Sequence, residues 1–230
     1  MKNILLIGCG DIAQRLIPSL IKRYRVLALL RPSSPDALQR AQHLRSLGVR
    51  ILWGDLDYRK TLARLAGLAY QVIHLAPPTP TGASDERTRR LLARISAYSG
   101  AIVPQWQQKS LLLPRKNAGR AYQSTLHRRR LIYLSTTGVY GDCQGAWVDE
   151  TRPVAPHTAR AHRRVDAEQQ IRRWGAKKGR HALILRLPGI YAAERLPLSR
   201  FASQIPLICQ EEDSWGNHIH AGDVCRAIRA

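Results

Sequence analysis

The sequence is poor in acidic side chains, in paired cysteines and in long apolar runs. Its 230 residues hold 16 Asp and Glu against 37 Lys and Arg, a formal net charge of +21 at pH 7. No apolar run approaches the length of about 18 residues that a membrane-spanning helix requires. The four cysteines form no Cys-x-x-Cys pair. These absences argue against a transmembrane helix, a disulfide framework and a zinc site, and they favour a cytoplasmic protein.

Positive charge is what the sequence has in excess, and it attracts partners that carry phosphate without specifying a fold. The partner is a nucleotide or a nucleic acid, or else the arginines simply occupy solvated helix faces. Residues 104–130 contain no acidic residue and end in His127-Arg128-Arg129-Arg130. We interpret this stretch as a basic insertion, either a solvated loop or a nucleic-acid contact in which Trp106 and Tyr122 stack on bases.

Short apolar runs alternate with amphipathic segments along the chain. Strands are expected at residues 3–7, 24–30, 49–53, 70–75, 131–135 and 181–187, and helices at 11–22, 35–47, 59–66, 84–98 and 159–174. Strands that alternate with helices imply parallel pairing through right-handed crossovers. The predicted fold class is therefore α/β, a Rossmann-type doubly wound parallel sheet.

The first strand is followed by a glycine-rich turn. The run from Gly8 to Ala13 fits the pattern G-x-G-x-x-G/A, and it lies between a strand and a helix, as a dinucleotide-binding turn requires. Gly8 permits the tight turn, Gly10 lets the backbone approach a pyrophosphate, and Ala13 allows close packing of helix on strand. Amides of the first helical turn hold the phosphates. The predicted cofactor residues here are Gly8, Gly10, Asp11 and Ile12.

The second strand ends in Leu30-Arg31 and lacks the acidic residue that accepts a hydrogen bond from the ribose 2′-hydroxyl of NAD. An arginine at this place favours the 2′-phosphate of NADP. The sequence therefore predicts NADP as cofactor, with NAD as the alternative if Arg31 is only a surface residue of a very basic protein.

Six further motifs occur in order after the glycine turn. They are Trp53-Gly54-Asp55-Leu56, His74-Leu75-Ala76-Pro77-Pro78, Tyr133-Leu134-Ser135-Thr136-Thr137-Gly138-Val139-Tyr140-Gly141, Val148-Asp149-Glu150, Leu185-Arg186-Leu187-Pro188-Gly189-Ile190-Tyr191 and Asn217-His218-Ile219-His220-Ala221-Gly222-Asp223. Together they resemble the extended short-chain dehydrogenase/reductases of the NAD-dependent epimerase/dehydratase type, from residue 1 to about residue 225.

The resemblance implies where the cofactor lies. It implies three groups of contacts: Asp55 and Leu56 beside the adenine, Leu75, Ala76 and Pro77 along the cofactor, and Pro188, Gly189, Ile190 and Tyr191 near the nicotinamide amide. Thr136 matches the serine or threonine that hydrogen-bonds the reacting oxygen. All these residues are expected where parallel strands end and a crevice opens.

The chain departs from the family at the catalytic tyrosine and lysine. Counted back from Glu168, which matches the glutamate that anchors the lysine, the lysine position is Arg164 and the tyrosine position is Arg160. Arg164 can still hydrogen-bond a ribose, but a guanidinium stays protonated, so Arg160 cannot donate and accept the proton. Three alternatives are open for this proton transfer: Tyr140 carries it out, the substrate itself carries it out, or no group replaces the tyrosine. We expect an NADP-dependent oxidoreductase or epimerase-like enzyme on a small hydroxyl or carbonyl substrate, or else an NADP-binding protein without turnover, such as a redox sensor.

Two features of the C-terminal part need an interpretation, namely its length and its polar residues. Similar proteins continue well beyond residues 217–223, so we expect a dinucleotide-binding domain over residues 1–187 and a reduced or truncated substrate lobe over residues 188–230. His218, His220 and Asp223 suggest a metal site, but the spacing positions no third strong ligand, and no metal is expected. A junction between a strand and a helix, with Asp223 near the helix start, is the simpler interpretation.

Overall fold

The main sheet has six parallel strands. The computed structural model describes residues 1–96, 129–196, 198, 203, 209, 213 and 215–230. Within them the strand order is β3-β2-β1-β4-β5-β6. The strands are β1 (Lys2–Ile7), β2 (Tyr24–Leu30), β3 (Arg50–Trp53), β4 (Gln71–His74), β5 (Arg129–Thr136) and β6 (Arg180–Leu187). The predicted doubly wound α/β fold is confirmed, and the order reverses between β1 and β4, where ligands bind in such sheets.

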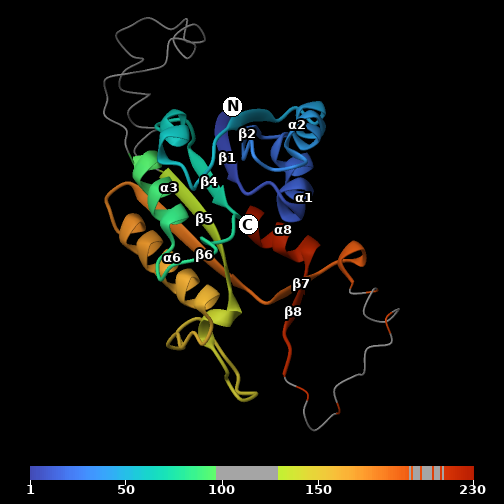
Figure 1. Cartoon of the computed structure of the whole chain (residues 1–230), viewed down its shortest axis with the longest axis vertical. Coiled ribbons are helices and arrows are strands. Elements are labelled where there is room, and N and C mark those ends of the chain that lie inside the picture. The colour runs from blue at the N-terminus through green and yellow to red at the C-terminus, as the bar shows by residue number, and fades with distance from the viewer. Residues whose placement is uncertain (97–128, 197, 199–202, 204–208, 210–212, 214) are drawn as a thin grey trace, which may run out of the picture.

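Helices cover both faces of the sheet (Figure 1). The α-helices are α1 (Asp11–Leu20), α2 (Ala37–Ser46), α3 (Glu86–Ser96), α6 (Ala159–Gly175) and α8 (Ala221–Arg229). Three short segments are 3₁₀ helices: η1 (Arg59–Leu65), η2 (Thr137–Tyr140) and η3 (Ala193–Arg195). Apolar side chains of α1, α2 and α8 form one buried cluster, and those of η1, α3 and α6 form another.

Successive residues of β1 are apolar, without alternating polar residues, because both faces of this strand are buried. Ile4 and Leu6 belong to the cluster under α1, whereas Leu5 and Ile7 belong to the cluster under α3 and α6. All four side chains are at most 1% exposed. A strand that is buried on both faces needs apolar residues at every position, which is what parallel sheets between two helical layers produce.

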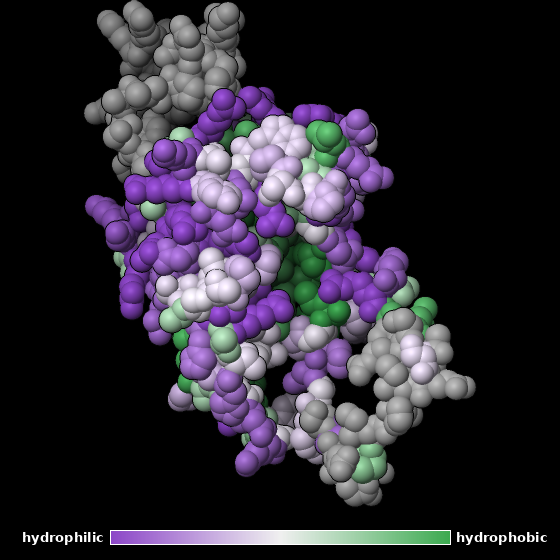
Figure 2. All heavy atoms as spheres, in the orientation of Figure 1, coloured by the Kyte–Doolittle hydropathy of each residue, from purple (hydrophilic) through white to green (hydrophobic). Residues whose placement is uncertain are grey.

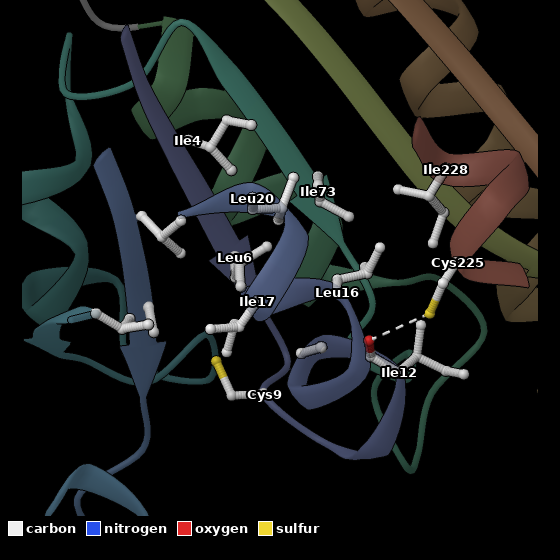
Figure 3. Packing of buried hydrophobic residues seen from close by; sticks show 14 of the residues in the cluster. Ile4, Leu6, Cys9, Ile12, Leu16, Ile17, Leu20, Ile73, Cys225 and Ile228 are labelled. Carbon is white, nitrogen blue, oxygen red and sulfur yellow. Dashed lines mark hydrogen bonds between the residues drawn. The ribbon is translucent and has the colours of Figure 1, made fainter. Parts of the chain in front are cut away.

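The segment after β6 shares its core with the six-stranded part. Two short strands, β7 (Gly189–Tyr191) and β8 (His218–His220), pair in parallel as a separate sheet and lead into α8. Figure 3 shows Cys225 and Ile228 of α8 beside Ile12 and Leu16 of α1, and the Cys225 thiol donates to the Ile12 carbonyl at 3.9 Å. The helix that closes the described chain therefore packs directly on the helix that follows the glycine turn.

The fifth strand begins earlier than the sequence predicted. Arg129 and Arg130, assigned to the basic insertion, are the first residues of β5 and pair in register with Arg180 and His181 of β6. Their polarity reflects the exposed end of a strand and not a loop. Residues 97–128, with Trp106, Tyr122 and the rest of the predicted insertion, lie outside the described residues. In the part of the chain that is described, no helix has the length and hydropathy needed to cross a bilayer.

The packing of α8 on α1 can be tested by removing one side chain. Ile228 is 5% exposed in the shared cluster. We expect Ile228→Ala to lower the free energy of unfolding by about 2–5 kcal/mol, measured by urea denaturation, because the change leaves a cavity in the core. Arg229→Ala, at the exposed neighbouring position, is the control and should change it little. Equal denaturation midpoints for the two variants would contradict this packing.

Candidate functional site

A cavity of about 460 Å³ opens at the carboxyl ends of the strands. This volume lies in the range of small-molecule sites. The predicted residues that line it are Gly8, Gly10, Asp11, Ile12, Arg31, Asp55, Leu56, Leu75, Ala76, Pro77, Arg164 and Ile190. They come from segments spread from β1 to β7, which the order of the sheet brings together. On the face drawn in Figure 2, hydrophobic side chains gather in a central hollow and hydrophilic ones surround it.

Several predicted residues do not line this cavity, namely Thr136, Arg160, Pro188, Gly189 and Tyr191. The Thr136 hydroxyl accepts a hydrogen bond from the Gly138 amide at 3.2 Å and caps η2. Arg160 is exposed in the first turn of α6. Gly189 and Tyr191 belong to β7, where the Tyr191 ring meets His220 edge to face, with ring centroids 5.3 Å apart.

The glycine turn is shaped to receive a ligand on its backbone. Gly8 has φ +89°, and a Cβ there would lie 2.5 Å from the Ala76 amide nitrogen. At Gly10 a Cβ would meet no atom within 4 Å, so its backbone faces open space. Gly10 also caps α1 without any side-chain hydrogen bond. The amides of the first turn are thus left without a side-chain cap, as an anion site at a helix N-terminus requires.

Cys9 is a buried part of this turn and not a reactive thiol. Its side chain is 5% exposed, and the Sγ donates to the Leu29 carbonyl at 3.8 Å. Burial raises the pKa of the Cys9 thiol to about 12, against a smaller opposing effect of Arg40. The thiol is therefore neutral at physiological pH, although it lies next to a helix N-terminus.

Two polar residues that the sequence did not single out lie beside Arg31 at the end of β2. Ser34 and Arg40 line the cavity with it. The Ser34 hydroxyl donates to Asp36 at 2.6 Å, Arg40 pairs with the same carboxylate, and the pKa of Asp36 is lowered by these two contacts in that order. Within the described residues, Arg31 lies in no ion pair, and its side chain is exposed. This end of the cavity therefore offers an exposed arginine that forms no ion pair within the described residues, although its charge contributes to the lowered pKa of Asp57.

Arg87 of α3 joins the two loops that flank the cavity on its other side. Its guanidinium binds both carboxylate oxygens of Asp57, at 2.8 and 2.6 Å, and donates to the Pro78 carbonyl at 3.2 Å. The Arg87 contact lowers the pKa of Asp57. Asp57 follows Asp55 and Leu56, while Pro78 follows Pro77, so this one side chain joins the segment predicted beside the adenine to the segment predicted along the cofactor.

At the opposite end, Arg164 and Ser135 bring unpaired polar atoms to the cavity. Arg164 is buried, and its Nη1 donates to the Tyr133 hydroxyl at 2.8 Å and to the Leu134 carbonyl at 2.7 Å. Its Nε and the Ser135 Oγ are buried and have no partner in the described part of the chain. Both residues line the cavity. A buried polar group without a partner costs about 1–3 kcal/mol, so these atoms fit a bound ligand that supplies the partners.

A buried hydrogen-bond network holds Tyr133 and thereby Arg164. The ring of His74 packs on Tyr133 at 5.1 Å, and its Nε2 lies 3.0 Å from the Thr88 hydroxyl. Thr88 gives its only proton to Asp85 at 2.6 Å, so it accepts from His74, which is protonated at Nε2. Burial lowers the pKa of His74 to about 3 and raises that of Tyr133 to about 12. Both rings are neutral at physiological pH and act as a frame.

Glu168 does not anchor Arg164, in contrast to what the resemblance implies. This carboxylate is 1% exposed and binds Arg186 of β6, with Nη2–Oε2 at 2.7 Å. That contact is the first cause of the raised pKa of Arg186. Arg186 also lies over the ring of Tyr140, which is buried and does not line the cavity. Tyr140 is therefore not positioned to replace the missing catalytic tyrosine.

The histidines near the C-terminus form a helix start. His220 Nδ1 accepts a hydrogen bond from the Gly222 amide at 3.2 Å and caps α8, while Asp223 pairs with Arg226. In the described residues, no group of three or more His, Cys, Asp or Glu side chains is arranged to hold a metal ion.

Comparisons with known proteins agree with this arrangement. The profile of a family described as "NAD dependent epimerase/dehydratase family" matches residues 4–230. No curated protein matches the sequence. A functionally unknown conserved protein from Silicibacter pomeroyi DSS is 26% identical with a TM-score of 0.62, over 100% of this chain and 67% of that one.

Two enzyme structures show the same fold at lower identity. A UDP-glucuronic acid 4-epimerase from Bacillus cereus, in complex with UDP-glucuronic acid and NAD, is 18% identical with a TM-score of 0.67, over 99% of this chain and 72% of that one. A dTDP-glucose 4,6-dehydratase from Bacillus anthracis, in complex with NAD, is 15% identical with a TM-score of 0.70, over 100% of this chain and 71% of that one.

The close approach at Gly8 gives a test of the site. We expect Gly8→Ala to weaken binding of a pyridine dinucleotide by about tenfold or more in calorimetry, because the new Cβ displaces the backbone of Ala76. The matched control is Gly48→Ala, where φ is +81° but a Cβ meets nothing within 4 Å. It should lower stability by about 1–2 kcal/mol and leave binding intact. Unchanged binding in Gly8→Ala would remove the glycine turn from the site.

Proposed function

The chain belongs to the NAD dependent epimerase/dehydratase family, and on this premise we propose that it binds NADP and catalyses oxidoreduction or an epimerase-like reaction of a small hydroxyl or carbonyl substrate. The observation that carries this proposal is the glycine turn, in which Gly10 faces open space at an uncapped helix N-terminus. The positive end of the helix dipole and the backbone amides at the start of α1 favour binding of the diphosphate bridge of a dinucleotide.

The lining of the cavity suggests how the cofactor lies. The diphosphate sits against Gly10 and Ile12, and the adenine lies between the segments that Arg87 joins. The nicotinamide riboside reaches Ile190, Ser135 and Arg164. It can supply the hydrogen-bond partners that the Ser135 hydroxyl and the Arg164 Nε need. This orientation follows from the position of the phosphates at α1, because the two nucleosides must then extend to opposite ends of the cavity.

We assign the 2′-phosphate of NADP to Arg31, Ser34 and Arg40. Arg40 already shares its charge with Asp36, whereas Arg31 lies in no ion pair within the described residues. A dianionic phosphate gains charge-assisted hydrogen bonds from Arg31 that a ribose hydroxyl cannot match. NAD, which the two enzyme structures contain, lacks this phosphate and would bind more weakly to this chain.

When bound, the nicotinamide ring supplies or accepts a hydride. Ser135 offers its hydroxyl to an oxygen inside the cavity, and Thr136 comes one position later as the family's equivalent of that group. Arg164 holds the ribose and stays charged throughout. No tyrosine of the described chain lines the cavity. We therefore assign the transfer of the accompanying proton, which leaves in an oxidation and enters in a reduction, to the substrate itself or to water.

The missing tyrosine also supports a second candidate function. A protein that holds NADP without turnover, for example as a redox sensor, needs the cavity but no proton donor. The exposed position of Arg160 favours this candidate, whereas the hydroxyl of Ser135 in the cavity favours the enzyme. For either function we propose a cytoplasmic location, because all four cysteines are free of disulfides.

Cofactor choice is tested at the end of β2. We expect Arg31→Ala to weaken NADP binding by about tenfold or more, the equivalent of about 1.4 kcal/mol, and to leave NAD binding nearly unchanged, because only NADP loses a contact between opposite charges. Arg59→Ala removes an exposed arginine that does not line the cavity and serves as the control. Equal losses for the two dinucleotides in Arg31→Ala would refute the assignment.

Turnover is tested by hydride exchange. NADPH labelled with deuterium at C4 is incubated with the protein and a panel of sugars, aldehydes and ketones, and transfer of the label is followed by mass spectrometry. We expect transfer to at least one compound, and a loss of about tenfold or more in Ser135→Ala if its hydroxyl binds the reacting oxygen. Tight NADPH binding without transfer to any compound would favour the non-catalytic candidate.

A further inference from the structure

Ion pairs join the segment after β7 to the first turns of α1. The Arg15 guanidinium binds Asp11 through Nε, at 2.7 Å, and Glu194 of η3 through Nη2, at 2.8 Å. Arg195 of η3 reaches back to the other carboxylate oxygen of Asp11, with Nη1–Oδ2 at 3.2 Å. These four side chains carry two positive and two negative charges, so the cluster brings no net charge to the start of α1.

The backbone of η3 is held in place by the core as well as by these ion pairs. Ala192, which precedes η3, is 2% exposed and belongs to the buried cluster that α1 and α8 share. The Arg195 amide donates to the Ala192 carbonyl at 2.9 Å. On either side of this segment, β7 pairs with β8, and β8 leads directly into α8. Arg195 therefore projects from a backbone that is anchored beside α1.

Only part of this cluster belongs to the cavity. Arg195 and Asp11 line it, whereas Arg15 and Glu194 do not. Gly10 precedes Asp11, lines the cavity too and faces open space at the uncapped start of α1. Arg195 is therefore a cation on the cavity wall beside the glycine turn.

The other arginines of the lining serve different parts of the cavity. Arg31 and Arg40 lie at the end to which we assign the 2′-phosphate, Arg87 is bound by a carboxylate, and Arg164 lies at the nicotinamide end. Within the described part of the chain, Arg195 is the one among these five that pairs with a side chain in the first turn of α1. It is therefore the cation best placed for a ligand group at that turn.

The contact between Arg195 and Asp11 can be given up without leaving a carboxylate unpaired. Asp11 keeps its shorter contact with Arg15, and Glu194 keeps its own contact with the same guanidinium. The Arg195 side chain is 41% exposed, so it can turn without vacating a buried position. The ion pair between Arg15 and Glu194 meanwhile keeps η3 attached to α1.

We propose that Arg195 leaves Asp11 when a dinucleotide binds and donates hydrogen bonds to the diphosphate bridge. This inference rests on the proposed function, because it takes the bridge to lie at Gly10 and Ile12. The amides at the start of α1 then bind one side of the bridge, and the guanidinium binds the other. Hydrogen bonds between a guanidinium and phosphate oxygens are charge-assisted and stronger than those between neutral groups. The segment after β6 thereby becomes part of the cofactor site.

The alternative is that Arg195 only ties η3 to α1. Exposed ion pairs contribute little to stability, and the pair between Arg15 and Glu194 already makes this tie. The two roles differ in what they predict for Glu194. A structural tie is shared by Glu194 and Arg195, whereas a contact with the ligand belongs to Arg195 alone.

The test compares three variants of the full chain by calorimetry with NADP, NAD and ADP-ribose, which share only the adenine, its ribose, the diphosphate and the second ribose. Arg195→Ala removes the proposed contact. Glu194→Gln removes the other ion pair between η3 and α1 and leaves the cavity lining intact. Arg226→Ala is the matched control, because it removes an exposed arginine that pairs with an aspartate in the first turn of α8 and does not line the cavity.

We expect Arg195→Ala to weaken binding of all three ligands by about tenfold, because each loses the same charge-assisted contact. This pattern differs from that of Arg31→Ala, which acts on NADP alone. Arg195→Lys should restore part of the affinity, because an ammonium keeps the charge but not the planar fork of donors. Glu194→Gln and Arg226→Ala should bind all three ligands within about twofold of the unaltered protein.

Four outcomes would overturn this role of Arg195. A loss confined to NADP would place Arg195 at the 2′-phosphate, and a loss that spares ADP-ribose would place it at the nicotinamide. Equal losses in Arg195→Ala and Glu194→Gln would show a structural tie, and equal affinities of Arg195→Ala and Arg226→Ala would show no contact. In all four cases the unaltered protein still binds a dinucleotide and the proposed function stands. If the unaltered protein binds none of the three ligands, both the proposed function and this inference fail.

Discussion

The backbones of Gly8 and Ala76 approach so closely that no side chain fits between them, and the cavity depends on this contact. It joins the loop after β1 to the loop after β4, the two neighbouring strands between which the order of the sheet reverses. Because the chain leaves these strands on opposite faces, a crevice opens there. The contact also fixes the direction in which α1 starts, so that its uncapped amides face the cavity. A single glycine conformation thus determines where a dinucleotide can bind.

At the far end of the cavity, hydrogen bonds hold a buried arginine in place. The guanidinium of Arg164 is held by Tyr133 and by a backbone carbonyl, whereas Glu168 binds Arg186. The His74 ring behind Tyr133 is uncharged at physiological pH, since burial lowers its pKa to about 3. Such a frame can position an arginine and a serine hydroxyl, but it contains no group that exchanges a proton near neutrality. This is the physical reason why binding is better supported than turnover.

Charged side chains lie at both edges of the main sheet. Near the cavity, Arg87 is held by Asp57 and Arg40 by Asp36, whereas Arg31 forms no ion pair within the described residues. At the other edge, cationic residues occur among the first two positions of five strands of the main sheet. One parallel fold accommodates two different electrostatic environments because its strand starts and strand ends lie at opposite edges.

The sequence by itself determined the elements and the phosphate turn, because both are local: apolar runs such as residues 3–7 must be buried on two faces, and Gly8 is followed at once by the helix that it serves. It did not determine the beginning of β5, since Arg129 and Arg130 are polar where a strand end is exposed. It also missed Ser34, Arg40, Arg87 and Ser135 as cavity residues. Only the tertiary structure decided these, because the order of the strands, and not sequence spacing, brings their segments to one cavity.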